Sequence, residues 1–170
     1  MITRKMLGIM LLAAITCISC QSSDARPKKN VPVPSTQEKF TDSAELAFQL
    51  NQKTWCSNNE ALALVLMLKN GQDDCNNFAE RYNQLIKQGF IKSKWKMQPN
   101  DSVTKGAFAY LVCKALDIKG GVMMHIIPSQ RYAYREAVYL GLISSGAENE
   151  PLTGPEVVGI MSRAARWNVK

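Results

Sequence analysis

The stretch Phe78–Leu116, FAERYNQLIKQGFIKSKWKMQPNDSVTKGAFAYLVCKAL, predicts how most of the chain folds. Apolar residues recur every three or four positions at both of its ends, which is the period of an amphipathic helix. Between the ends lie Gly89, a residue that favours the left-handed conformation that stops a helix, and a polar elbow containing Pro99. Thr104 provides the hydroxyl that can cap a second helix. The stretch therefore predicts a helix, an elbow and a second helix.

The second helix of this unit has two counterparts elsewhere in the chain. In each, a hydroxyl residue precedes apolar residues at positions i, i+3, i+4 and i+7. The three hydroxyl residues are Ser57, Thr104 and Thr153, which are 47 and 49 residues apart. Glu60 and Glu156 follow the first and the last by three positions and complete capping boxes, whereas Thr104 has no acidic partner.

The first helix also recurs, because Tyr82–Gly89 matches Tyr134–Gly141 at an offset of 52 residues. Asp42–Gln52 is interpreted as the first helix of a shorter unit. A period of about 50 residues is typical of repeat folds in which neighbouring units bury each other's apolar faces. We therefore expect an all-α bundle of three helix–elbow–helix units in a domain at 40–170. The predicted units lie at about 42–69, 76–116 and 130–167.

An apolar leader precedes this domain. Arg4 and Lys5 form a positive start, and the apolar run that follows is shorter than the roughly 20 residues that a membrane-spanning helix needs. This arrangement is typical of a signal peptide, which we place at 1–19. Ser19-Cys20 resembles the lipobox of bacterial lipoproteins, in which a small residue precedes the cysteine that becomes lipidated.

The lipobox resemblance implies a palmitate-type acyl anchor on Cys20, which would be the new N-terminus. Cys17 is an alternative lipidation site, and an ordinary cleaved signal peptide is the other interpretation. Because Gln21 follows Cys20 in place of Asp, the resemblance implies export to the outer membrane, facing the periplasm or the surface. Residues 20–39 are rich in proline and poor in large apolar residues, so we expect a disordered tether after Cys20.

The three units resemble S-layer homology domains. That family ends its first helix with Gly-Ile/Leu-Ile and begins its second with an Ile-Thr-Arg-Ala-Glu-like motif. Gln88–Ile91 and Val103–Phe108 carry the pattern in the second unit, Leu140–Ile143 and Pro151–Val157 carry it in the third, and Cys56–Ala61 matches it more loosely. The resemblance implies a pseudo-threefold bundle that attaches noncovalently to an anionic cell-wall polysaccharide, bound in grooves between the units.

The arginine of that motif is replaced in every unit, by Asn58, Lys105 and Gly154. Only Lys105 keeps the positive charge, and its ammonium cannot form the bidentate fork of a guanidinium. In the elbow before Lys105, Trp95 and Lys96 offer an indole face for a sugar and a cation for a carboxylate. We therefore expect Trp95, Lys96 and Lys105 to bind the polymer. The alternative is a solvated loop whose Trp95 fills the bundle.

The other reactive residues favour binding without catalysis. His125, in an apolar link between the second and third units, has no partner at the spacing of a metal site or a general base, so we expect a partly buried structural histidine in a short strand or a 3₁₀ turn. One disulfide among Cys56, Cys75 and Cys113 is possible in an oxidising compartment, and the sequence does not indicate which pair. No serine-hydrolase, phosphate-loop or metalloprotease motif is present, which predicts a non-enzymatic protein without metal or cofactor.

The formal net charge of +7 falls to +5 without Arg4 and Lys5 and favours an anionic partner. Nucleic acid is disfavoured because the leader predicts export. The sequence thus predicts a membrane-anchored envelope lipoprotein whose domain binds an anionic cell-wall or envelope polymer. The alternative is a protein-interaction module or an accessory subunit of an envelope assembly complex.

Overall fold

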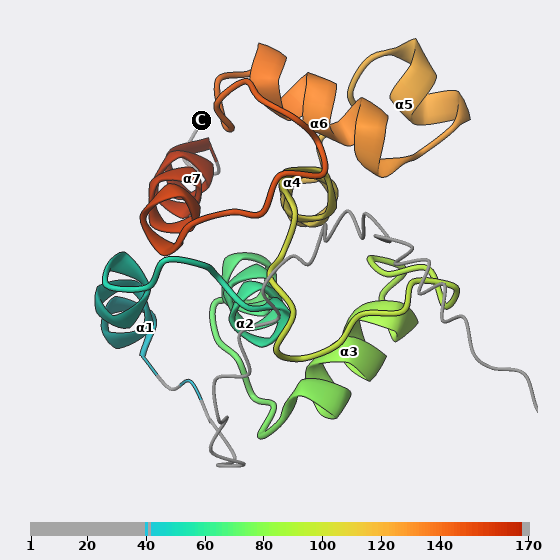
Figure 1. Cartoon of the computed structure of the whole chain (residues 1–170). Coiled ribbons are helices and arrows are strands. Elements are labelled where there is room, and N and C mark those ends of the chain that lie inside the picture. The colour runs from blue at the N-terminus through green and yellow to red at the C-terminus, as the bar shows by residue number, and fades with distance from the viewer. Residues whose placement is uncertain (1–39, 41, 168–170) are drawn as a thin grey trace, which may run out of the picture. The chain divides into compact units, whose positions relative to one another are not determined.

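The computed structural model describes residue 40 and residues 42–167, and all regular secondary structure in this part of the chain is helical (Figure 1). The helices are α1 (Ser43–Asn51), α2 (Asn58–Asn70), α3 (Phe78–Lys87), α4 (Lys105–Ala115), α5 (Val122–Ile126), α6 (Gln130–Tyr139) and α7 (Gly154–Trp167). The predicted all-α class is confirmed. The predicted signal peptide, Cys20 and the tether lie outside the described residues.

The predicted N-caps of α2, α4 and α7 are confirmed. The hydroxyls of Ser57, Thr104 and Thr153 each accept a hydrogen bond from the backbone N–H three residues further on, at 3.3 to 3.4 Å. Glu60 and Glu156 accept hydrogen bonds from the N–H groups of Ser57 and Thr153, both at 2.9 Å. Two capping boxes therefore form, and Thr104 caps α4 without one.

Glycines end α3 and α6 as predicted. Gly89 and Gly141 adopt φ values of 75° and 69°, in the left-handed region that favours glycine. The next residues, Phe90 and Leu142, donate hydrogen bonds from their N–H groups to carbonyls of α3 and α6, each at 2.8 Å. Both side chains are buried, so the chain turns back under each helix end.

The starts of α2, α4 and α7 meet in a closed ring of backbone hydrogen bonds. Cys56 N–H donates to the carbonyl of Leu152 at 3.0 Å, Leu152 N–H to that of Val103 at 2.9 Å, and Val103 N–H to that of Cys56 at 3.0 Å. All three residues are fully buried. Each residue directly precedes an N-cap, so one contact point fixes three helix starts relative to one another.

The first helix of each predicted unit packs against the second helix of a different unit. α3 packs mainly against α2, α6 against α4, and α1 against α7 (Figure 1). The pairing is cyclic, because α1 has no preceding unit and instead contacts the last helix. Each of these pairs therefore packs helices that lie in different predicted units.

The first residue of α2, α4 and α7, where the S-layer homology motif has arginine, also contacts another predicted unit. Its backbone N–H donates to a carbonyl of an elbow, at 2.8 Å from Asn58 to Asp101, 2.9 Å from Lys105 to Glu150, and 3.2 Å from Gly154 to Lys53. A Cβ atom added to Gly154 would lie 1.8 Å from the carbonyl oxygen of Leu50. The end of α1 thus leaves no room for any side chain at this position, which gives a steric reason for the glycine.

A fully buried guanidinium holds α3 in place. Arg81 Nε lies 2.6 Å from Asp73 Oδ2, and neither side chain is exposed to solvent. Arg81 also donates to Asn59 at 2.8 Å and to the carbonyl of Cys75 at 3.0 Å, and it lies over the ring of Phe40. These contacts satisfy the buried charge, which is costly to leave without partners.

Two expectations for the link after α4 are wrong. The segment forms the short helix α5 in place of a strand or a 3₁₀ turn, and His125 is exposed rather than partly buried. The reason is that a five-residue helix on the surface buries one side only, and here Met124 is the residue that packs inward. The described cysteines Cys56, Cys75 and Cys113 are free thiols, and all three are buried.

Candidate functional site

The ring of Tyr110, in the middle of α4, is surrounded by an aromatic and two basic side chains. Trp95 meets it edge-on, with 5.2 Å between ring centroids and 63° between ring planes. The Nζ atoms of Lys92 and Lys114 each lie 5.9 Å from the Tyr110 centroid, within the range of a cation–π contact. Tyr82 fixes the elbow by donating its hydroxyl hydrogen bond to the carbonyl of Trp95.

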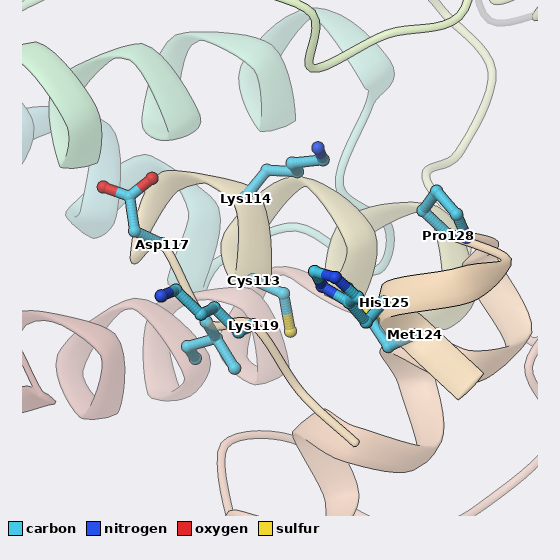
Figure 2. A pocket seen from close by; sticks show the side chains of 8 residues that line it. Cys113, Lys114, Asp117, Lys119, Met124, His125 and Pro128 are labelled. Atoms are coloured by element: carbon cyan, nitrogen blue, oxygen red, sulfur yellow. The ribbon is translucent and has the colours of Figure 1, made fainter. Parts of the chain in front are cut away.

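A cavity of about 290 Å³ opens beside Lys114, between the end of α4 and α5 (Figure 2). It is lined by Cys113, Lys114, Asp117, Ile118, Lys119, Met124, His125 and Pro128. Lys92 contacts this lining, because its Nζ donates to the carbonyl of Pro128 at 2.6 Å. The cavity and the Tyr110 cluster are therefore contiguous. We call the surface formed by Lys92, Trp95, Lys114, Lys119 and His125 the basic groove.

Cations dominate the electrostatics of the basic groove. Lys92, Lys114 and Lys119 contribute three amines to it. The acidic residue of the lining, Asp117, is paired with Lys69 at 2.9 Å outside the groove. An anion that enters the groove therefore meets amines whose nearby carboxylate is already neutralised.

Trp95, one of the predicted binding residues, lies in the basic groove and is half-buried, whereas Lys96 is exposed beside it in the chain. The alternative for Trp95 also has support, because its ring covers Tyr110, which is buried. The indole thus combines an inner packed edge with an outer edge that solvent can reach.

Lys105 occupies a different environment, at the N-terminal end of α4. It is only 4% exposed, and its Nζ lies 2.8 Å from Glu150 and 3.5 Å from Glu156. The hydrogen bond to Glu150 raises the pKa of Lys105, although burial acts in the opposite direction. Burial alone would raise the pKa of Glu156, but hydrogen bonds from Thr153 and the charge of Lys105 hold it below its ordinary value.

Lys105 lines a second cavity of about 290 Å³, which it shares with Glu156 and Arg163. Arg163 is oriented by a hydrogen bond from its Nε to the carbonyl of Leu142 at 2.8 Å. The structure therefore places Trp95 in the basic groove and Lys105 in this second cavity. The sequence does not indicate that Lys92, Lys114 and Lys119 are neighbours. They come together only in the fold, where Lys92 and Lys114 contact the ring of Tyr110 and Lys114 and Lys119 line the cavity beside α5.

Among the described residues, no group of three or more His, Cys, Asp or Glu side chains has the arrangement of a metal site. Within the same residues, no helix combines the length and the hydropathy needed to cross a bilayer. Comparison with protein-family models and with curated protein sequences gives no match to this chain.

Proposed function

We propose that this protein is a lipid-anchored component of a bacterial envelope whose helical domain binds an anionic cell-wall or envelope polymer in the basic groove. The observation that supports the proposal is that Lys114 and Lys119 line one cavity whose acidic residue is already paired, while Lys92 bonds to Pro128 of the same lining. In this proposal Cys20 carries the acyl anchor, residues 20–39 are the tether, and the chain is exported to the outer membrane. The activity is binding, with no catalytic step, cofactor, metal or nucleic acid.

The chemistry of the groove suits a charged saccharide. Lysine amines pair with carboxylates or phosphates as compact, rotatable charges that do not require a fixed planar partner. The outer edge of Trp95 offers an apolar surface for the face of a sugar ring beside those charges. An extended polymer can contact the elbow and the cavity together, because Lys92 contacts both.

The interpretation as three S-layer-homology-like units with pseudo-threefold symmetry is part of this proposal. The ring formed by Cys56, Val103 and Leu152 and the cyclic pairing of the helices support it. Lys105 differs from the arginine of the family motif, because Glu150 and Glu156 already pair with it. We therefore propose that the polymer binds mainly at the opposite end of α4, with Trp95 and Lys96 beside the cavity.

Sedimentation of the purified protein with isolated envelope material tests this function. The variant Lys114→Gln/Lys119→Gln removes two positive charges from the cavity and is expected to bind about 30-fold more weakly, since each charged contact contributes on the order of 1 kcal/mol. The matched control Lys87→Gln/Arg166→Gln removes the same charge from exposed positions on α3 and α7 and is expected to bind like the native protein.

Raising the salt concentration should weaken native binding more than the residual binding of Lys114→Gln/Lys119→Gln, because salt screens the lost interactions. Equal sedimentation of the native protein, the cavity variant and the control would rule out the basic groove as the binding site. Equal losses in the cavity variant and the control would indicate a response to net charge alone.

A further inference from the structure

Helix α5 presents four apolar side chains to solvent, which we call the α5 face. Val122, Met123, Ile126 and Ile127 are 74%, 55%, 65% and 56% exposed. Single exposed apolar residues are common, but four within six consecutive positions of one short element are not. Figure 1 shows α5 beside α6, the helix against which it packs.

The α5 face is held outward by contacts on its other side. Met124 is 7% exposed and packs inward, and the N–H of Gly121 donates to Glu136 Oε2 of α6 at 3.0 Å. Gly120 has a φ of 63°, and a Cβ there would lie 3.0 Å from the side chain of Met124. At the far end, Lys92 holds the carbonyl of Pro128. The face therefore cannot turn inward without breaking these contacts.

Over residues 117–136 the cations Lys119, Arg131 and Arg135 outnumber two carboxylates, Asp117 and Glu136, of which Glu136 is bonded to Gly121. The segment 118–135 contains no Asp or Glu, whereas it contains Lys119, His125, Arg131 and Arg135, all exposed. An apolar centre with a basic rim matches a bilayer surface, because hydrocarbon accepts the apolar side chains and anionic head groups meet the cations.

We propose that the α5 face inserts into the surface of an anionic bilayer, as a membrane contact of the folded domain that is separate from any anchor on Cys20. Insertion of Val122, Ile126 and Ile127 would allow the exposed cations Arg131 and Arg135 to pair with lipid phosphates. This contact differs from polymer binding in its apolar residues, because none of the four residues of the α5 face lines the cavity.

Quenching of a tryptophan on α5 by lipids tests the proposal in the full-length chain. Any membrane binding by the leader is common to all variants, so the comparison between variants reports on α5. The variant Ile126→Trp is mixed with phosphatidylcholine vesicles that contain phosphatidylglycerol and brominated acyl chains. The expected result is a blue shift and a loss of emission beyond that of the native protein with its own tryptophans. Tyr139→Trp, at an 84% exposed position on α6, is the matched control and should show no added quenching.

Two further variants separate the contributions of the face and its rim. Adding Val122→Ser and Ile127→Ser to Ile126→Trp should abolish the added quenching, and Arg131→Gln/Arg135→Gln should reduce it in anionic vesicles. Sedimentation of Val122→Ser/Ile127→Ser with envelope polymer from which the lipid has been extracted should stay at the native level, so failure of either proposal is recognisable alone. Circular dichroism checks that each variant is helical.

Three outcomes would overturn the membrane contact. One is an Ile126→Trp signal no larger than that of the native protein. Another is equal quenching in vesicles of phosphatidylcholine alone, which would remove the role of anionic lipid. The last is a blue shift of Ile126→Trp that depends on protein concentration in the absence of lipid, which would show that a second copy covers the α5 face.

Discussion

Lys105 and Lys114 both belong to α4, but their surroundings give them different roles. Lys105 is buried against Glu150 and Glu156, so its charge holds the start of α4 to the third unit. Lys114 is half-buried beside Tyr110 and opens onto the basic groove. Among the ion pairs of the described residues, none involves Lys114. Residue type alone does not distinguish a structural lysine from one that can bind a ligand.

The buried thiols make stability sensitive to alkaline pH. Burial raises the pKa of Cys113 to about 12 and also raises that of Cys56. Above pH 9.0, the ordinary value, the unfolded chain therefore releases protons that the folded chain retains, and unfolding becomes more favourable as pH rises. Each thiol lowers the free energy of unfolding by at most about 1.4 kcal/mol per pH unit in this range.

Urea unfolding at pH 8.5 and pH 10 measures this effect. The native protein should lose stability between the two pH values, and Cys113→Ala should lose less of its own, lower stability over the same interval. The comparison uses the pH dependence, so the cost of the cavity left by the substitution cancels. An identical pH dependence in both proteins would contradict a titrating Cys113.

Among the helices, the contact between α1 and α7 depends on Gly154, a residue without a side chain. Gly154 N–H bonds to Lys53, and the carbonyl of Leu50 occupies the space where a Cβ would lie. α1 and α7 are far apart in sequence, so this contact joins the two ends of the described domain.

Gly154→Ala should destabilise the protein by about 3 kcal/mol, because the backbone of α1 has to move to accept the methyl group. Gly159→Ala in the same helix is the matched control, since its Cβ would meet only the end of the Arg163 side chain at 3.5 Å. Alanine there should be neutral or stabilising by up to about 1 kcal/mol through its higher helix propensity. Chemical denaturation of both variants measures the difference, and equal stabilities would contradict the close approach.

For the whole molecule, cyclic packing predicts one cooperative unit. α1 contacts α7, α2 contacts α3, and α4 contacts α6, while the ring of Cys56, Val103 and Leu152 joins the three pairs. Loss of one pair exposes apolar faces of its neighbours. The structure therefore disfavours independent unfolding of the three predicted units.

Leu50→Ala tests this cooperativity at the end of α1, where the side chain is fully buried. The substitution should cost about 2–5 kcal/mol and shift a single transition to lower urea concentration. Far-UV circular dichroism and the combined fluorescence of Trp55, Trp95 and Trp167 should report the same midpoint, because two-state unfolding makes the probes coincide. Separate midpoints for the two probes would show that the domain does not unfold as one cooperative unit.

Local signals in the sequence determined where most helices begin and end. Ser57, Thr104 and Thr153 bond to N–H groups three residues away, and Gly89 and Gly141 adopt a conformation that other residues rarely tolerate, so a few neighbouring residues suffice. Only the tertiary structure decided which helices pair, that Lys105 is neutralised, that Lys114 and Lys119 share a cavity, and that α5 faces solvent. The physical reason is that burial and charge pairing depend on residues up to about a hundred positions apart in the chain, as in the contact of Leu50 with Gly154.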